Sequence, residues 1–293
     1  MEVLVPPVIG NVHLIEQCAM SMPAPKYSPN SGTLPPAPSG WRASGQQIIV
    51  LGVLLIGSLI LFRALGEFER SLSLLFLHQV PCGDNAAFNP EAEFCGWFPM
   101  LEHPAFRGFW KALVWLGGAG VLITALWGFS ASLTGRAVRL DRLYVSLLGI
   151  LSFVAGPIVI VNLLLKSHWG RPRPFQTIDL GRFMTYEKPG TISDQCAINC
   201  SFVSGDVALA AWTLFIVPFL PQRWRWPVGA LLVTYVVVVG FGRIAVGAHY
   251  LSDVVIAIIL TLLVIALMSR LLTSAPGVAV IRWLAVLRDP GAR

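Results

Sequence analysis

The sequence has too little charge for a protein that faces water on every side. Charged residues make up 12% of its 293 residues, against roughly 25% in a typical soluble domain. Hydrophobic residues make up 55%, so the chain cannot coat a folded surface with charge. In this context the net charge of +6 does not predict a nucleic-acid partner. It predicts attraction to a membrane surface or to an anionic substrate.

The chain also lacks the pattern of a metal site. Its five cysteines are Cys18, Cys82, Cys95, Cys196 and Cys200, and none stands in a CxxC pair with nearby histidines. Structural zinc sites use such closely spaced ligands. The cysteine spacing therefore does not predict a zinc site.

Residues 1–45 show no regular spacing of apolar residues and are rich in proline, serine and glycine. This segment also lacks the basic start, apolar run and cleavage site of a secretory signal. We expect residues 1–45 to form a disordered tail.

Six long apolar stretches follow this segment. They lie near residues 48–65, 109–130, 143–165, 205–221, 226–242 and 252–273. Most approach the roughly 20 residues that a helix needs to cross a bilayer. The sequence predicts an all-α integral membrane protein with a six-helix transmembrane bundle over residues 46–275. Residues 276–293 would be a C-terminal tail, in which "VAVIRWLAVLR" forms either an interfacial helix or an extended segment.

Arginines in the short loops predict the orientation of the bundle. They follow the second, fourth and sixth stretches, at Arg136, Arg139, Arg142, Arg223, Arg225, Arg270, Arg282, Arg288 and Arg293. The segment between the first and second stretches carries many acids instead. We therefore expect both termini in the cytoplasm, and the loops after the first, third and fifth stretches outside.

Four of the cysteines then fall on the outer side and Cys18 falls inside. This distribution suits an oxidising outer compartment. Pairing of Cys82 with Cys95, and of Cys196 with Cys200, is the most local option. Two other pairings remain open, as does a set of four unpaired thiols.

Polar residues gather at three outer ends of the stretches. They stand in "KSHWGRPRPF" (166–175), "NCSFVSGDVA" (199–208) and "GRIAVGAHYLSD" (242–253). Because successive spans alternate in direction, all three segments emerge on one side of the membrane. The sequence thus predicts a shared pocket there, formed by Lys166, Arg173, Ser204, Gly205, Arg243 and His249.

The residue types in this pocket suit an anion. Lys166, Arg173 and Arg243 are cations, and arginine holds phosphate oxygens in two-point contact. Ser204 and Gly205 open a helix whose free N–H groups and dipole favour negative charge. For any one of these basic residues, anchoring to lipid head groups is an alternative role.

His249 and Asp253 stand four residues apart. If a helix begins there, they share one face, and the carboxylate can hold the imidazole in one tautomer. A neutral imidazole nitrogen can attack phosphorus. The alternative is an interfacial histidine beside a helix-starting aspartate.

These three segments resemble the motifs of the type 2 phosphatidic acid phosphatase superfamily. The first motif, Lys-x6-Arg-Pro, matches Lys166 and Arg173-Pro174, and the third, Ser-Arg-x5-His-x3-Asp, matches Gly242-Arg243, His249 and Asp253. The second, Pro-Ser-Gly-His, matches Val203-Ser204-Gly205-Asp206. The resemblance covers roughly residues 48–273.

The resemblance implies a function for each of these residues. His249 would be the nucleophile that forms a phosphohistidine, and Asp253 would orient it. Lys166, Arg173, Arg243, Ser204 and the Gly205 N–H would bind the phosphate, without a metal. The fold would be a membrane bundle with the active site at its outer, periplasmic face.

Two positions depart from the family pattern. The second-motif histidine, which would protonate the leaving group, is replaced by Asp206. The acid would then be Asp206 itself or His168, or a good leaving group would need little protonation, or the enzyme would be impaired. Gly242 in place of serine removes one hydroxyl that could contact phosphate.

The segment "CAINCSFVSGDVA" resembles a bacterial subset that includes lipid A 4'-phosphatase-like proteins. This resemblance implies a bacterial inner membrane and a lipid substrate in its outer leaflet. We therefore expect a phosphatase acting on a lipid phosphate monoester of the lipid A, phosphatidic acid or phosphatidylglycerophosphate type. A polyprenyl diphosphate phosphatase and a non-catalytic phospholipid-binding or transport protein are the alternatives. The sequence predicts no particular oligomeric state.

Overall fold

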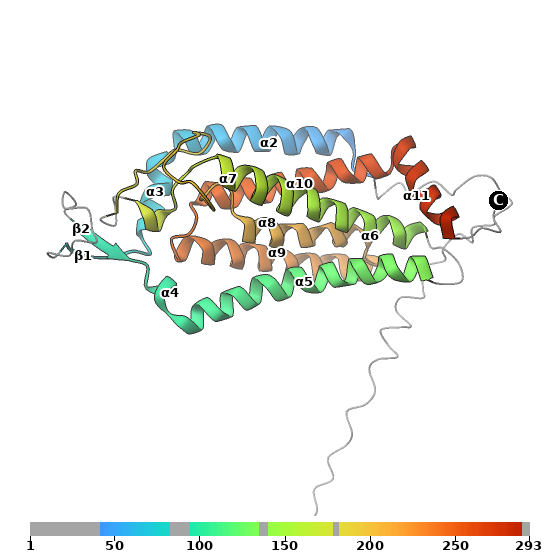
Figure 1. Ribbon diagram of the computed structural model, residues 1–293, viewed down its shortest axis with the longest axis horizontal. Helices are drawn as coiled ribbons and strands as arrows, with labels where there is room; N and C mark the ends of the chain where they lie inside the picture. Colours follow the sequence, from blue (N-terminus) through green and yellow to red (C-terminus); the bar gives the residue numbers. More distant parts are fainter. Residues whose placement is uncertain (1–41, 83–93, 135–139, 178–181, 289–293) are drawn as a thin grey trace, which may run out of the picture.

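The computed structural model describes residues 42–82, 94–134, 140–177 and 182–288 of the chain. They form an elongated bundle of helices that lie roughly along one axis (Figure 1). The helices are α2 (Gly45–Ala64), α3 (Gly66–Leu74), α4 (Pro99–Glu102), α5 (Pro104–Thr134), α6 (Leu140–Phe153), α7 (Lys166–His168), α8 (Gly205–Trp212), α9 (Gln222–Ala245), α10 (Leu251–Leu272) and α11 (Ala275–Arg288). A π-helical segment η2 (Val154–Leu165) and two 3-10 segments, η3 (Pro174–Gln176) and η5 (Thr213–Phe219), complete the helical elements, and the strands are β1 (His78–Pro81) and β2 (Phe94–Trp97).

In the described part of the chain, five helical stretches are long and apolar enough to cross a membrane. They are Gly45–Ala64, Pro104–Ser130, Arg142–His168, Gln222–Ala245 and Leu251–Leu272. The prediction of an all-α membrane protein is confirmed at this level. A sixth apolar stretch, Gly205–Phe219, is shorter.

This short stretch lies at the centre of the bundle. Helix α8 packs against η2, α5, α9 and α10, and six of its eight residues are buried. Small alanines such as Ala208 and Ala211, both fully buried, let the neighbouring helices approach. The 3-10 segment η5 continues α8. It extends farther than an α-helix of the same number of residues, because a 3-10 helix rises about 2.0 Å per residue and an α-helix about 1.5 Å.

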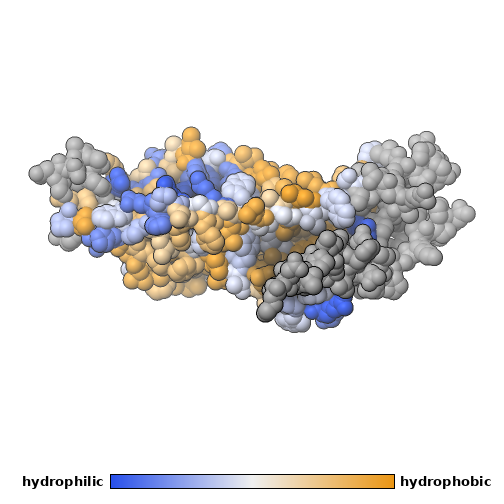
Figure 2. Space-filling model, turned by 90° about the horizontal axis from the view of Figure 1, so that it is seen from below, coloured by the Kyte–Doolittle hydropathy of each residue, from blue (hydrophilic) through white to orange (hydrophobic). Residues whose placement is uncertain are grey.

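The outside of the bundle is apolar. On α5, Trp115, Leu116, Ile123 and Trp127 are all more than 60% exposed. Figure 2 shows hydrophobic residues along the length of the bundle, with hydrophilic residues gathered towards the end that carries the β-hairpin. Such a surface is stable in lipid and would aggregate in water.

A small two-stranded sheet departs from the helical pattern that the sequence predicts. Strands β1 and β2 pair antiparallel, with His78 opposite Trp97 and Val80 opposite Cys95. A disulfide joins Cys82 to Cys95, and a second joins Cys196 to Cys200. Of the pairings that the sequence leaves open, the most local one is therefore confirmed.

The start of α2 and helix α11 lie at the end of the bundle opposite the hairpin (Figure 1). There the Ala43 N–H donates to Ser269 Oγ at 3.2 Å, which joins the start of α2 to the end of α10. Helix α11 packs against α6 and α10, with Ile281 buried, so the C-terminal segment takes the helical form of the two alternatives. The predicted tail over residues 1–45 lies almost wholly outside the described residues, as does Cys18.

Candidate active site

One end of the bundle brings together the residues that the sequence singles out. It holds the ends of η2 and α9, the starts of α7, α8 and α10, and the loops that join them (Figure 1). The expected convergence of the three motif segments is thus present in the fold. The side chains arrange themselves into a cationic group, a buried histidine and a buried ion network.

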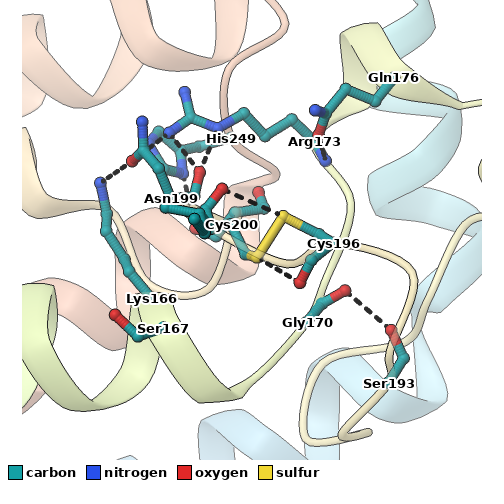
Figure 3. The surroundings of a disulfide bond; sticks show 12 residues. Lys166, Ser167, Gly170, Arg173, Gln176, Ser193, Cys196, Asn199, Cys200 and His249 are labelled. Carbon is teal, nitrogen blue, oxygen red and sulfur yellow. Dashed lines mark hydrogen bonds between the residues drawn. A yellow bond between two sulfur atoms is a disulfide. The ribbon is translucent and has the colours of Figure 1, made fainter.

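The cationic group includes Lys166 and Arg173, which meet at Asn199. Arg173 donates from Nε and Nη2 to the Asn199 carbonyl oxygen, at 3.1 and 2.8 Å. Asn199 Oδ1 accepts from Arg173 Nη2 at 2.8 Å and from Lys166 Nζ at 3.4 Å (Figure 3). Burial and the neighbouring charge of Arg243 lower the pKa of Arg173 from its usual range. Clustered, partly buried cations of this kind favour a bound anion.

The π-helical segment η2 delivers Lys166 to this group. Pro157 inside it has no N–H, so the regular hydrogen-bond ladder is interrupted there. Asn162 Nδ2 donates to the Pro157 carbonyl at 2.6 Å, which ties the Asn162 side chain to the helix backbone one turn before Lys166. Wide turns inside α-helices are rare and occur often at functional sites.

The start of α8 faces the same group. Ser204 is its N-cap residue, with extended backbone, and makes no side-chain capping bond. A methyl group placed on Gly205 would come within 3.3 Å of Lys166 Nζ, so the ammonium lies against the first helical residue. The free N–H groups and the lysine charge together favour an anion at this point.

His249 is almost completely buried, in the loop between α9 and α10. Its Nδ1 lies 2.8 Å from the Ser201 carbonyl oxygen. A carbonyl only accepts hydrogen bonds, so Nδ1 carries the proton and Nε2 carries the lone pair. Burial lowers the pKa of His249 well below its usual value; the Asp253 charge opposes this shift, and Arg243, Lys166 and Arg173 add to it. The imidazole is therefore neutral, as a nucleophile requires.

Asp253 does not contact the imidazole of His249 as directly as the sequence predicts. Helix α10 begins at Leu251, so His249 precedes the helix instead of sharing its face. Asp253 Oδ2 lies 3.8 Å from His249 Nδ1, beyond hydrogen-bond distance. The main-chain carbonyl of Ser201 fixes the tautomer, and the carboxylate acts on the ring through its charge.

Arg171, a residue that sequence reasoning missed, holds Asp253 in place. Its Nη1 donates to Asp253 Oδ1 at 2.6 Å, and its Nη2 to Glu69 Oε1 at 2.5 Å. All three side chains are fully buried. The guanidinium also lies over the Tyr250 ring, 4.4 Å from its centroid. The two carboxylates raise the pKa of Arg171 against the effect of burial, so the network keeps its charges.

Arg243 and Asp206 form an ion pair at the mouth of the site, with Arg243 Nη1 3.2 Å from Asp206 Oδ2. Both side chains are partly exposed. In this arrangement, Asp206 is paired with a cation rather than poised as a free acid. His168, the other candidate acid, has an exposed side chain whose Nδ1 lies 2.9 Å from the Leu164 carbonyl oxygen of the preceding turn.

Three site residues carry buried polar atoms without a partner among the described residues. They are Ser204 Oγ, Arg243 Nε and His249 Nε2. An unsatisfied buried polar atom costs about 1–3 kcal/mol, so proteins keep few of them. Here they are a hydroxyl, a guanidinium N–H and the lone-pair nitrogen, which are the groups that a phosphate ester needs as ligands and nucleophile.

Comparison with known proteins gives a consistent result. The model of the PAP2 superfamily matches residues 143–275. A lipid A 4'-phosphatase of Rhizobium leguminosarum is 34% identical over 224 residues, covering 74% of this chain and 92% of the relative. The corresponding protein of Rhizobium etli is 32% identical over 224 residues, and covers 74% of this chain and 83% of the relative. A lipid A 4'-phosphatase of Francisella tularensis subsp. novicida is 39% identical over 102 residues, 34% of this chain and 46% of the relative.

The chain belongs to the PAP2 superfamily. The resemblance that the three motifs carry is thereby confirmed, including its lipid A 4'-phosphatase-like subset. No solved structure matches the chain significantly.

The packing around Gly242 explains why this PAP2 protein departs from the family motif, which has serine at that position. A methyl group on Gly242 would clash with the ring of Trp110, which lies directly on the α9 backbone beside Arg243. A serine at this position therefore has no room unless α5 moves. The bulk of Trp110, rather than a hydroxyl, fills that part of the site wall.

Asn199 and Ser201 are further site residues that sequence reasoning missed. Both act partly through main-chain atoms, which any residue type possesses, so their identity gives no motif. Arg171 had a weak signal, because it stands two residues before Arg173 in the same "RPRP" segment. Glu69 had none, because an acid in a loop between spans predicts a solvated surface.

Proposed function

We propose that this PAP2-superfamily protein is a membrane lipid phosphatase that hydrolyses a phosphate monoester on a lipid head group of the lipid A type. The observation that carries the proposal is the buried His249, with its tautomer fixed and its Nε2 without a partner, beside three cations. The relatives, which are lipid A 4'-phosphatases by name, support this substrate over phosphatidic acid or phosphatidylglycerophosphate.

The first step is attack of His249 Nε2 on phosphorus. A bond forms between Nε2 and phosphorus as the ester oxygen leaves, and the ring becomes positively charged while Nδ1 keeps its proton. The Ser201 carbonyl accepts that proton's hydrogen bond, and the Asp253 charge stabilises the cation. Lys166, Arg173, Arg243, Ser204 Oγ and the Gly205 N–H stabilise the oxygens of the transferring phosphoryl group.

Asp206 is the acid in this mechanism. A substrate phosphate that binds Arg243 replaces Asp206 as the partner of the guanidinium. The freed carboxyl group then lies beside the phosphate, within reach of the leaving ester oxygen. It gives a proton to the leaving alkoxide and, as a base, takes one from the water that hydrolyses the phosphohistidine. Inorganic phosphate and the free lipid alcohol are the products.

We place the site at the outer face of a bacterial inner membrane, with six membrane-embedded helices over residues 46–275 and both termini cytoplasmic. Arg142, Arg223, Arg225 and Arg270, which the structure describes, lie at the starts of α6 and α9 and at the end of α10, away from the site, and the positive-inside rule favours the cytoplasm for that end. Two disulfides at the site end suit an oxidising compartment. The membrane lipid is the partner, and the mechanism uses no metal or other cofactor.

The test is phosphate release by the full-length protein, purified in detergent. The panel is lipid A, phosphatidic acid, phosphatidylglycerophosphate and undecaprenyl diphosphate. We expect release from lipid A by the wild type, none by His249→Ala, and near wild-type release by His168→Ala, the matched control. A phosphorylated His249 recovered after an alkaline quench, which preserves phosphohistidine, would identify the intermediate.

Other outcomes separate the alternatives. Preference for undecaprenyl diphosphate would indicate a polyprenyl diphosphate phosphatase. Binding of the lipids without release of phosphate would indicate a non-catalytic lipid-binding or transport protein. Full activity of Asp206→Asn would remove Asp206 as the acid.

A further inference from the structure

The five-residue segment Cys196–Cys200 is fastened to the first catalytic motif at both of its ends. The disulfide closes it, and the Cys200 N–H donates to the Lys166 carbonyl at 3.2 Å while the Cys196 N–H donates to the Gly170 carbonyl at 3.1 Å. Figure 3 shows this disulfide below and to the right of Asn199, with Lys166 to the left and the Arg173 side chain above. The segment therefore cannot move without the backbone that carries Lys166.

Within this closed segment, Asn199 has an unusual backbone. Its φ is 55°, in the left-handed region that asparagine tolerates better than most residues. This conformation aims both its main-chain and its side-chain oxygen at the cations. Nε and Nη2 of Arg173 donate their hydrogen bonds to Asn199. None of the described contacts involves Nη1, so this nitrogen can donate to phosphate.

Ser201 follows the disulfide directly and connects it to the nucleophile. Its N–H donates to the Arg171 carbonyl at 2.8 Å, and its hydroxyl donates to Asp253 Oδ2 at 2.5 Å. Its own carbonyl accepts from His249 Nδ1. One residue thereby fixes the tautomer of His249 and the position of the carboxylate beside it.

We propose that the Cys196–Cys200 disulfide is a positioning device of the active site, and that Asn199 and Ser201 are the positioning residues through which it acts. Asn199 sets the phosphate-binding cations, and Ser201 sets His249. Opening the disulfide frees the segment to leave its left-handed conformation, because a chain that is no longer closed regains conformational entropy. The proposal rests on the proposed function, and it makes the activity depend on one disulfide and not on the other.

The experiment compares two double variants of the full-length protein in detergent. Cys196→Ala with Cys200→Ala opens the site disulfide, and Cys82→Ala with Cys95→Ala opens the hairpin disulfide as the matched control. We measure kcat/KM on lipid A and the affinity for inorganic phosphate by titration calorimetry. We expect the first pair to lower kcat/KM about 10- to 100-fold and to weaken phosphate binding, because small misplacements of catalytic groups cost that much. The control pair stays within about twofold of the wild type.

Two single variants separate positioning from simple structural support. Asn199→Gly keeps the left-handed backbone and the main-chain acceptor but loses Oδ1, so phosphate binding and KM worsen more than kcat. Ser201→Ala keeps the carbonyl on His249 but loses the bond to Asp253, so kcat falls while phosphate binding is retained. General loosening of the fold would move both parameters together in both variants.

The results decide the proposal in each case. Wild-type kcat/KM and phosphate affinity in the Cys196/Cys200 variant would overturn it. If that variant does not fold, Asn199→Gly decides instead. Unchanged phosphate affinity in Asn199→Gly overturns the proposal, and weakened phosphate affinity supports it. If the wild-type protein releases no phosphate from any lipid, the proposed function fails. The phosphate affinities of the same variants then still decide whether the disulfide positions the cations.

Discussion

At the scale of single residues, the site depends on a neutral histidine kept among cations. His249 is 1% exposed, and Lys166, Arg173 and Arg243 disfavour its protonation. The nearby carboxylate opposes them without hydrogen bonding to the ring. In the proposed mechanism, a bound phosphate would offset the charge of these cations as the ring gains its own positive charge.

The buried neutral state of His249 predicts a pH dependence of stability. The pKa of His249 in the folded protein lies below the value of about 6.5 that the residue has when unfolded. As the pH falls below 6.5, the unfolded chain therefore binds a proton that the folded protein does not, and the free energy of unfolding decreases. Above pH 6.5 the ring is neutral in both states and this loss is absent. We expect the wild type to lose up to about 1.4 kcal/mol between pH 6.5 and pH 5.5, and His249→Gln to lose less. Unfolding in detergent, followed between pH 7.5 and 5.5, measures the difference.

His168→Gln is the control for this prediction, because it removes an imidazole that is exposed. It should keep the pH dependence of the wild type. Parallel curves for the wild type and His249→Gln would contradict the prediction.

Residues of the candidate site could be predicted from the sequence where the proposed mechanism uses their side chains. Lys166, Arg173 and His249 belong to types with few roles at a membrane surface, and their order placed them at one end of the bundle. Asn199 and Ser201 could not be found in this way, since their oxygens act only after the Cys196–Cys200 segment has folded. The 3.8 Å separation of His249 and Asp253 also depends on where α10 begins, which no spacing rule fixes to one residue.

At the scale of secondary-structure elements, Arg171 ties three separate parts of the chain together. Glu69 comes from α3, Asp253 from α10, and Arg171 from the loop after α7. The Ser252 N–H also donates to Glu69 Oε2 at 3.1 Å, so α3 caps the start of α10. The first segment between spans, which carries no motif, is in this way part of the support of the Asp253 carboxylate.

Replacing Arg171 by methionine should destabilise the protein severely. The change leaves two carboxylates buried without a cation, and breaking a buried pair in this way costs about 3–5 kcal/mol. The matched control is Arg70→Met, which removes an ion pair to Glu67 at 3.4 Å whose side chains are 38% and 75% exposed. Exposed pairs contribute about 0–1 kcal/mol. Chemical unfolding in detergent compares the two variants, and similar losses would refute the assignment of Arg171 as the central tie.

The positions of the long helices could be predicted from the sequence better than the way in which the helices pack in the bundle. The five long spans follow from apolar length alone, since the bilayer sets the number of residues. The fourth stretch looked like an ordinary span, but α8 and η5 form a short helix enclosed by its neighbours. The β-hairpin was missed because its strands have only four residues each, too few for an alternating pattern.

At the scale of the whole molecule, the two ends of the bundle differ in chemistry. One end carries both disulfides, the cationic group and the ion network. Among the described residues, the other carries the start of α2, helix α11 and four arginines, Arg142, Arg223, Arg225 and Arg270. A bilayer with an oxidising outer side and an anionic inner leaflet would hold such a molecule in one orientation only.

This asymmetry predicts which end can be labelled from outside the cell. Two exposed positions offer a matched pair: Ile192, 68% exposed at the site end, and Trp226, 81% exposed in the first turn of α9 at the other end. In a Cys18→Ser background, each is replaced by cysteine and the protein is treated with a membrane-impermeant maleimide in intact spheroplasts. We expect Ile192→Cys to react at once and Trp226→Cys to react only after the membrane is permeabilised. The reverse pattern would place the phosphate site in the cytoplasm, where the glutathione pool keeps thiols reduced and an outer-leaflet lipid could not reach His249.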